Sequence, residues 1–269
     1  MKEILKVNHL EVHHMDHKVS TNIISDISFS LEKNRCLGIV GESGSGKSIT
    51  CKAILGLLDK DFHIKGEVIF NDIHLLKADK RKIRQIRGKE ISMILQNPMT
   101  SFDPLYPIQE QMTETFIENL DISKKEALGL SLKTLENMNI LHPKDVLKKY
   151  PHQLSGGMLQ RVMIGTALTL KPSIIIADEP TTAVDAINVA KVMKEFSGIK
   201  EKHNTSMIFI SHDLGAVAKI SDDILVMKDG KIVEKGETQY VLRNPRSEHT
   251  RYLINTRKAL MDKFHQIVG

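Results

Sequence analysis

A glycine-rich run near the start of the chain has the residues and the spacing that bind phosphate. The pattern G-x-x-x-x-G-K-[ST] is matched at 41–48, between a continuous apolar stretch and a helical pattern. Glycines allow backbone N–H groups to turn inward around β- and γ-phosphates, and the N-terminus of the following helix adds positive potential. Lys47 supplies a charge and Ser48 offers a hydroxyl to Mg²⁺. The predicted nucleotide contacts are Gly41, Glu42, Ser43, Gly44, Ser45, Gly46, Lys47, Ser48 and Ile49.

Two acidic residues follow a second apolar stretch. Asp178 and Glu179 come directly after the run 174–177, and an α/β sheet presents its ligand-binding edge at the carboxyl ends of its strands. Asp178 could hold Mg²⁺ through water, and Glu179 could accept the proton of an attacking water as general base. Two acids after a strand are more often a solvated loop. Their combination with the phosphate loop favours the catalytic interpretation.

A third candidate opens a helix. Leu154-Ser155-Gly156-Gly157-Met158 combines a serine cap with two glycines, so backbone amides and a helix dipole could meet a second phosphate there. Capped helices commonly have such sequences, and the motif by itself is a weak signal. The chain would then have one phosphate loop but two helix N-termini that could bind phosphate, one after the loop and one at Ser155.

The elements around these residues alternate between strand and helix patterns, which predicts an α/β core. The run 37–40 is typical of a strand buried on both faces, and Lys228 to Lys231 of a hairpin turn centred on Asp-Gly. Further strands are expected at 4–12, 23–31, 67–70, 91–95, 174–177, 207–210 and 224–227. Helices are expected at 47–58, 108–119, 124–138, 157–170, 186–203 and 214–220.

This order predicts a core that is interrupted by a helical insertion and edged with antiparallel strands. We expect the ATP-binding α/β core at 1–98 and 171–240, a helical subdomain at 99–170 and a C-terminal helical tail at 241–269. The sequence shows neither an internal repeat nor a low-complexity segment.

Composition narrows the class of protein. The chain has 269 residues, 41% of them hydrophobic and 26% charged, which excludes disordered and fibrous proteins. Its net charge of +5 is too small to choose among nucleic acid, lipid and nucleotide partners. Two cysteines, Cys36 and Cys51, indicate a reducing compartment. No apolar run approaches the roughly 20 residues of a membrane span, and no export signal is visible, so a cytosolic chain is expected.

The motifs and their order resemble the ATP-binding cassette (ABC) family over nearly the whole chain. The resemblance rests on the phosphate loop, on Gln96 after a strand, on the signature 154–158, on Asp178-Glu179, and on His212 after the strand that ends in Ser211. Asp185 completes it, in the run Thr182-Ala183-Val184-Asp185. A P-loop (RecA-like) core with an N-terminal antiparallel β edge and an inserted helical subdomain is the fold that this resemblance implies.

The resemblance also implies a division of roles. Two such subunits hold two ATP molecules head to tail, so Ser155, Gly156, Gly157 and Asp185 would contact the nucleotide held by the partner. Ser48, Gln96 and Asp178 would serve Mg²⁺, and Gln96 would also sense the attacking water. His212 would contact the γ-phosphate beside the base Glu179. ATP and Mg²⁺ are the expected cofactors.

A finer resemblance lies within the family. The segments 96–104, 154–161 and 244–253 look like the ATP-binding subunits of bacterial oligopeptide, dipeptide and nickel importers, as does Met158 in the fifth place of the signature. The longer peptide-importer subunits carry a C-terminal cysteine cluster for an iron–sulfur centre, and Cys36 and Cys51 both lie upstream. The resemblance therefore implies a nickel or metal–chelator importer, with an oligopeptide or dipeptide importer as the alternative.

The expected partners follow from the same resemblance. They are a second, related ATP-binding subunit in a heterodimer, two membrane-spanning permease subunits and a substrate-binding protein, with no nucleic acid. The chain would lie peripherally at the cytoplasmic face of the cell membrane. A soluble cassette acting on DNA or the ribosome is the rival class, but it usually carries two cassettes or a long coiled coil. A P-loop kinase would explain neither the signature nor His212.

Two features stay open at this point. Members of the family usually stack adenine on an aromatic residue before the second strand, but no Phe, Tyr or Trp precedes Phe29. Either His13, His14 or an aliphatic residue such as Ile24 takes that place, or ATP binds more weakly. The histidines His9, His13, His14 and His17 could sense metal, although surface histidines are usually solvated. A basic run from Lys77 to Lys89 is interpreted as a solvated helix face, with headgroup contact as the minor alternative.

Overall fold

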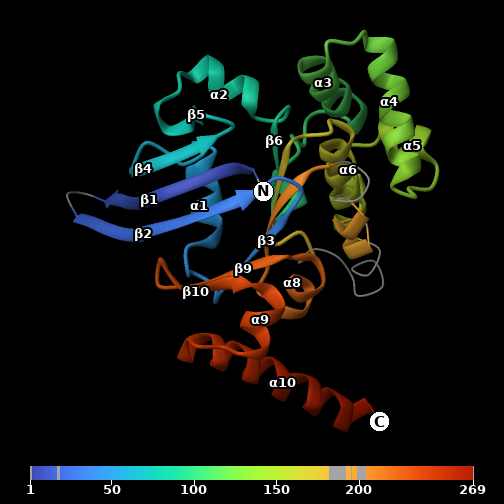
Figure 1. Cartoon of the computed structure of the whole chain (residues 1–269). Coiled ribbons are helices and arrows are strands. Elements are labelled where there is room, and N and C mark those ends of the chain that lie inside the picture. Colours follow the sequence, from blue (N-terminus) through green and yellow to red (C-terminus); the bar gives the residue numbers. More distant parts are fainter. Residues whose placement is uncertain (1, 17–18, 182–191, 195, 199–203, 269) are drawn as a thin grey trace. The chain divides into compact units, whose positions relative to one another are not determined.

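The computed structural model describes residues 2–16, 19–181, 192–194, 196–198 and 204–268, with side chains described up to Arg257 and at Ala259. The chain forms two compact units. The split unit combines Met1–Ile83 with Ser206–Gly269, and the continuous unit is Arg84–Thr205. Figure 1 labels the elements of both.

The split unit contains an antiparallel sheet in the order β2-β1-β4-β5. Its strands are β1 (Glu3–Asp16), β2 (Val19–Glu32), β4 (Phe62–Phe70) and β5 (Ile73–His74). Apolar residues alternate along β1, and Leu5, Val7, Leu10 and Val12 are buried. Since neighbouring strand residues point to opposite faces, this alternation gives the sheet one buried face. The antiparallel edge expected from the sequence is confirmed.

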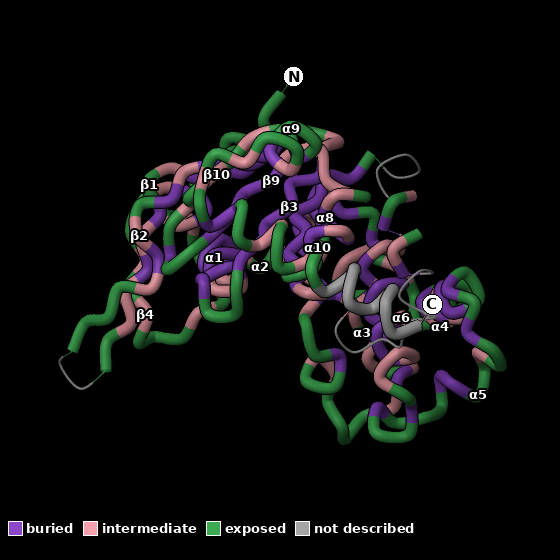
Figure 2. Tube along the Cα trace, turned by 90° about the horizontal axis from the view of Figure 1, so that it is seen from below, coloured by how far each residue is buried: buried purple, intermediate pink, exposed green. Residues whose placement is uncertain are grey.

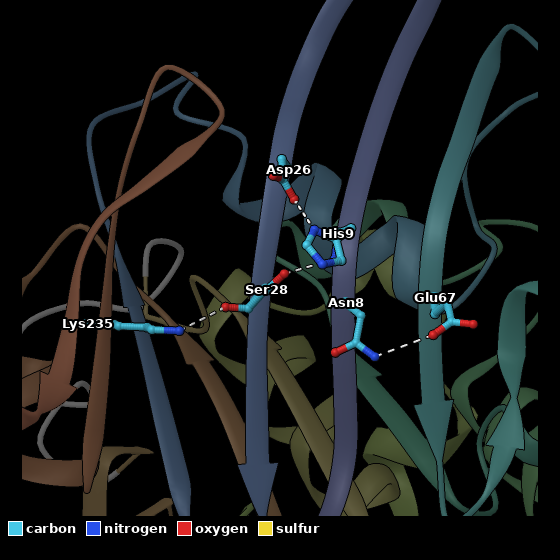
Figure 3. Close-up of polar contacts among 6 residues, drawn as sticks. All are labelled: Asn8, His9, Asp26, Ser28, Glu67 and Lys235. Atoms are coloured by element: carbon cyan, nitrogen blue, oxygen red, sulfur yellow. Dashed lines mark hydrogen bonds and ion pairs between the residues drawn. The ribbon is translucent and has the colours of Figure 1, made fainter.

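Bulges interrupt this sheet where β1 and β2 change register. His9 (φ 47°) and Asp26 (φ 49°) both adopt left-handed backbone conformations, and His9 Nδ1 lies 2.7 Å from Asp26 Oδ1 (Figure 3). The backbone N–H of His9 donates to Ser28 Oγ at 2.9 Å, and Lys235 Nζ donates to the carbonyl of Ser28 at 3.3 Å. A Cβ at Gly66 would overlap the carbonyl of His9, so a glycine is required opposite the bulge.

A second set of strands in the split unit surrounds β3 (Cys36–Val40). β3 pairs in parallel with β8 (Ser206–Ile210) and with β9 (Asp223–Lys228), and β10 (Lys231–Glu237) pairs antiparallel with β9. Every residue of β3 is buried (Figure 2). A strand with paired neighbours on both sides and both faces covered needs a continuous apolar run, which the sequence supplies.

Four helices of the split unit accompany these strands: α1 (Lys47–Ile54), α8 (Leu214–Ile220), α9 (Thr238–Arg243) and α10 (Glu248–Val268). α8 packs on β3 and β8, and α10 packs on α8 and β10. A Cβ at Gly38 would overlap Val217, which explains the glycine in the middle of β3.

The start of α10 is fixed to β10 by one carboxylate. Glu234 accepts hydrogen bonds from the backbone N–H groups of Arg246 at 2.8 Å and Ser247 at 2.9 Å. Burial opposes ionisation of this carboxyl. The backbone hydrogen bonds from Arg246 and Ser247 and the charge of Arg246 outweigh burial, and the pKa of Glu234 lies below its usual value. Glu234 therefore acts as an ionised anchor for the segment that leads into α10.

The continuous unit holds a parallel strand pair and a group of helices. β6 (Ile91–Ile94) pairs with β7 (Ile174–Asp178). The helices are α3 (Ile108–Leu120), α4 (Lys124–Asn137), α5 (Pro143–Lys148) and α6 (Gly156–Thr169), with short 3-10 turns at Pro98–Thr100 and Pro151–Gln153. α4 packs against α3, α5 and α6. A capping box of Ser123 and Glu126 starts α4. The chain enters this unit through α2 (Lys80–Ile86), after the 3-10 turn Leu75–Lys77.

Most expected elements are present, and the differences have local causes. α1 ends at Ile54 rather than at 58, because the chain turns at Gly56, whose φ of 61° is left-handed. β1, β2 and β4 are longer than their alternating cores, since pairing continues past the apolar residues. The turn from Lys228 to Lys231 is confirmed. The helix expected at 186–203 lies largely outside the described residues.

Within the described part of the chain, no helix has both the length and the apolar character that crossing a membrane requires.

Two glycines in helices of the continuous unit allow a matched test of the packing between α4 and α6. A Cβ at Gly165 in α6 would lie 2.6 Å from Met138 Cγ and 2.9 Å from Thr134 Cγ2. Apart from the backbone of α4 itself, none of the described atoms lies within 4 Å of a Cβ at Gly129. We expect Gly165→Ala to lower the free energy of unfolding by about 1–2 kcal/mol, because overpacking exceeds the gain in helix propensity. Gly129→Ala should raise it by about 0.5–1 kcal/mol. Urea unfolding of both variants measures this; stabilisation by Gly165→Ala would contradict the packing.

Candidate nucleotide site

The phosphate loop joins the end of β3 to the start of α1. Gly44 (φ 82°) and Gly46 (φ 98°) adopt left-handed conformations that other residues rarely take. Gly46 is the N-cap of α1, provides no side-chain cap, and no acidic residue lies in the first turn. The positive end of this helix is therefore not neutralised by the helix's own side chains, which suits an anion.

Lys47 places its charge inside this loop. The side chain is buried, and Nζ donates to the carbonyl oxygens of Gly41 at 2.9 Å and of Glu42 at 2.8 Å. A buried ammonium group needs such acceptors, because desolvation without them is costly. The loop thus fixes one full positive charge among its own backbone groups; the contact of this charge with phosphate stays a prediction.

A hairpin turn is hydrogen-bonded to the phosphate loop. The backbone N–H of Gly230, in the turn between β9 and β10, donates to the carbonyl of Ser45 at 3.2 Å, and its own carbonyl accepts from the N–H of Ser25 on β2 at 2.9 Å. Gly230 has a φ of 72°, and a Cβ there would overlap the carbonyl of Ile23. The sequence predicted only a turn here; the link to the phosphate loop was missed, since no local pattern signals it.

His212 lies at the same cavity as the phosphate loop. A cavity of about 470 Å³ in the split unit is lined by Gly41 and Glu42 together with His212. The residue before it, Ser211, continues β8, and its backbone N–H donates to the carbonyl of Ile39 on β3 at 3.2 Å. The structure therefore brings together two groups of residues that the sequence assigned to one nucleotide.

The continuous unit positions the acidic pair and Gln96. Asp178 ends β7 and is buried, and Glu179 follows with a left-handed φ of 45°. A glutamate in this conformation costs on the order of 1–3 kcal/mol and is typical of functional sites. Gln96 Nε2 lies 3.4 Å from Glu179 Oε2. Because β6 and β7 are parallel neighbours, the residues after them meet at one edge.

The signature opens α6 as predicted. Ser155 is the N-cap, and its hydroxyl accepts from the backbone N–H of Met158 at 3.3 Å. Apart from the backbone of α6 itself, a Cβ at Gly157 would meet no described atom within 4 Å. Packing within this unit therefore does not explain the glycine. Asp185, the fourth predicted contact to the partner's nucleotide, lies outside the described residues.

The N-terminal histidines have other partners in the sheet. His9 pairs with Asp26, and His13 Nε2 lies 3.4 Å from Glu11 Oε2. Within the residues that the structure describes, no group of three or more His, Cys, Asp or Glu side chains could hold a metal ion. His17 is not among those residues. The described histidines thus do not form a metal cluster.

The structure also separates the candidates for the adenine contact. Ile24 is fully buried, and a Cβ at Gly46 would overlap its Cδ1, so this side chain lies against the phosphate loop. The imidazole of His14 is half-buried, with its ring centroid 4.7 Å from that of Phe62. His14 therefore offers an aromatic surface backed by a second ring, while Ile24 offers no exposed face.

Comparison with known proteins finds relatives that match nearly the whole chain. The family model for ABC transporters matches residues 24–182. The metal-staphylopine import system ATP-binding protein of Staphylococcus aureus is 42% identical over 98% of this chain and 97% of its own length. The dipeptide transport ATP-binding protein of Lactococcus lactis is 39% identical over 100% of this chain and 77% of its own. A solved dimeric bacterial ABC transporter cassette has a TM-score of 0.78 at 25% identity, covering 87% of this chain and 98% of that one.

The support that the turn between β9 and β10 gives to the phosphate loop can be tested at Gly230. We expect Gly230→Ala to lower the free energy of unfolding by about 2–5 kcal/mol, from the left-handed backbone and the overlap with Ile23. Binding of a fluorescent ATP analogue should weaken in the same variant, because Ser45 loses its support. Asp229→Asn, in the same turn, keeps a residue type that tolerates a left-handed φ and should bind like the wild type. An unchanged affinity in Gly230→Ala would refute the supporting role.

Proposed function

We propose that this chain, which belongs to the ABC transporter family, hydrolyses ATP as the energy-coupling subunit of an importer. The observation that carries the proposal is the phosphate loop, whose buried Lys47 and left-handed glycines form an anion site at the start of α1. Similarity to ATP-binding proteins of import systems over nearly the full chain supports the coupling to import.

Each residue of the predicted site has a role in hydrolysis under this proposal. Lys47 and the backbone of the loop hold the β- and γ-phosphates, and His212 contacts the γ-phosphate from across the same cavity. Glu179 accepts a proton from the attacking water, whose oxygen bonds to the γ-phosphorus as the bond to ADP breaks. Gln96, 3.4 Å from Glu179, orients that water. The left-handed backbone at Glu179 aims this one carboxylate.

Mg²⁺ fits the residues assigned to it. Ser48 would contribute a hydroxyl, Gln96 an amide oxygen and Asp178 a carboxylate, and these hard oxygen donors are the ligands that Mg²⁺ prefers. When bound, the ion neutralises charge that develops on the β- and γ-phosphates. Asp178 is buried at the end of β7, so its carboxylate is held in place for that role.

We further propose that each nucleotide site is completed by a second ATP-binding subunit. Ser155, Gly156, Gly157 and Asp185 would contact the ATP on the partner's phosphate loop. The open surroundings of Gly157 and the exposed position of Ser155 support this assignment. The partner would be a related but different chain, and the pair would act on two permease subunits and receive substrate through a binding protein.

The subunit would thereby lie at the cytoplasmic face of the cell membrane without spanning it. Residues 1–98 and 171–240 would bind ATP, 99–170 would meet the permease, and 241–269 would form the helical tail. For the substrate we propose nickel or a metal–chelator complex. The similarity to a metal-staphylopine import protein supports it, whereas the similarity to a dipeptide transport protein supports peptide import as the second candidate.

The base assignment predicts a clear split between binding and turnover. Glu179→Gln should keep ATP affinity but lower the hydrolysis rate by about 10²–10⁴-fold in the assembled complex, because an amide cannot accept the proton. Lys47→Ala should instead weaken ATP binding, since the charge that faces the phosphates is gone. Equilibrium binding and steady-state hydrolysis measure the two effects. Wild-type turnover in Glu179→Gln would show that another residue is the base.

The substrate is tested by uptake in cells that lack this subunit. Under metal limitation, we expect cellular nickel, cobalt or zinc to fall, and the wild-type gene but not Glu179→Gln to restore it. Elemental analysis measures the metals, and a toxic-peptide growth assay runs beside it. Unchanged metal content together with acquired peptide resistance would overturn the metal assignment in favour of peptide import. Normal uptake of both would overturn the importer function.

A further inference from the structure

The C-terminal helix α10 forms one wall of the cavity at the phosphate loop. Besides Gly41, Glu42 and His212, the cavity is lined by Tyr252, Leu253, Thr256 and Arg257 from this helix. α10 is the long red helix in Figure 1, and it packs on α8 and β10. A helix from the end of the chain therefore shares a cavity with the two groups that we assign to the phosphates.

One residue of α10 is bound to the loop that carries His212. Arg257 Nη1 lies 2.8 Å from Asp213 Oδ1. Asp213 follows His212 directly and caps α8, because Oδ1 also accepts from the backbone N–H of Gly215 at 2.8 Å. The backbone N–H of Asp213 in turn donates to Ser211 Oγ at 3.0 Å. His212 is thus held between two residues with fixed partners.

Gly215 provides the space for this contact. A Cβ at Gly215 would overlap the guanidinium of Arg257, including Nη2, Cζ and Nη1. The guanidinium therefore lies directly over the backbone of Gly215 at the start of α8. Gly215 is absent from the residues with left-handed φ, so backbone conformation does not demand a glycine here. The close approach of Arg257 is the reason that the structure offers for it.

The ion pair of Arg257 with Asp213 contributes to the geometry of the loop more than to the stability of the fold. A cation near the N-terminus of a helix is opposed by the helix dipole, so Arg257 depends on the Asp213 carboxylate for its position. The side chains of Arg257 and Asp213 are 35% and 51% exposed, and ion pairs this exposed add little to stability. Their direction is nevertheless set, since Asp213 is fixed by α8 and the start of α10 by Glu234.

We propose that Arg257 is a positioning residue of the nucleotide site. Through Asp213 it holds the loop from Ser211 to Leu214, and it thereby sets where His212 stands relative to the phosphate loop. The inference rests on the proposed function, in which His212 contacts the γ-phosphate. Under it, α10 takes part in placing His212, although Arg257 lies outside the segments that carry the sequence resemblance.

The test uses the chain in complex with its partner ATP-binding subunit and permease. Arg257→Ala should lower kcat for ATP hydrolysis about tenfold and change the KM for ATP less than about twofold, since misplacing a group at the reacting centre affects turnover more than binding. Arg257→Lys keeps the charge and should recover most of the loss. A purely structural role would not produce this split or this rescue.

Gly215→Ala provides a second variant that leaves Arg257 in the sequence. The added methyl would displace only the far end of a flexible side chain, while the N–H that Asp213 accepts from is retained. It should lower kcat as Arg257→Ala does, with an unchanged thermal unfolding midpoint. Arg251→Ala is the matched control: Arg251 is an exposed arginine on the same helix, and its replacement should leave kcat and KM unchanged.

His212→Ala separates this inference from the proposed function. If His212→Ala abolishes hydrolysis while Arg257→Ala and Gly215→Ala both keep wild-type kcat, the role of Arg257 is refuted and the proposed function stands. If His212→Ala leaves hydrolysis intact, the γ-phosphate contact is wrong, and the inference falls with it. A loss of kcat in Arg257→Ala that neither Arg257→Lys restores nor Gly215→Ala reproduces would also refute it.

Discussion

The nucleotide site depends on hydrogen bonds that fix the main chain of the phosphate loop. A loop that turns its amides toward an anion cannot also satisfy them by regular pairing, so its conformation must be fixed from outside. Gly230 does this from the turn between β9 and β10, bonded to Ser45 on one side and Ser25 on the other. Lys47 does it from within, through the carbonyls of Gly41 and Glu42. Both supports act on main-chain atoms of the loop.

The same principle separates the residues that perform chemistry from those that place them. Glu179 carries its carboxylate on a left-handed backbone, and Gln96 meets it because β6 and β7 end at the same edge. Ser155 begins α6, whose position is set on the other side by Gly165 against Met138 and Thr134. In each case a glycine or an unusual φ, rather than a reactive group, determines where the reactive group lies.

The features predicted from the sequence are local, whereas most of the features that were missed join segments far apart in the chain. The phosphate loop, the acids after β7, the cap at Ser155 and the turn before β10 are local patterns, and each is present in the structure. The support of Ser45 by Gly230 and the ion pair of Arg257 with Asp213 join distant segments, and no period or motif signals such contacts. The bulge at His9 and Asp26 was missed for another reason: a change of register inside an alternating strand looks like continued alternation.

The division of the chain into a split and a continuous unit has a consequence for synthesis. Asn34 hydrogen-bonds to Ser206, 172 residues later, and β3 needs β8 and β9 on its two sides. At about 5–20 residues per second, a ribosome delivers those partners roughly 10–40 s after β3 emerges. During that interval an entirely apolar strand has neither neighbour, whereas the continuous unit is made in one stretch. The newly made chain therefore has a defined period of aggregation risk, and the cell's chaperones are expected to bind it around β3.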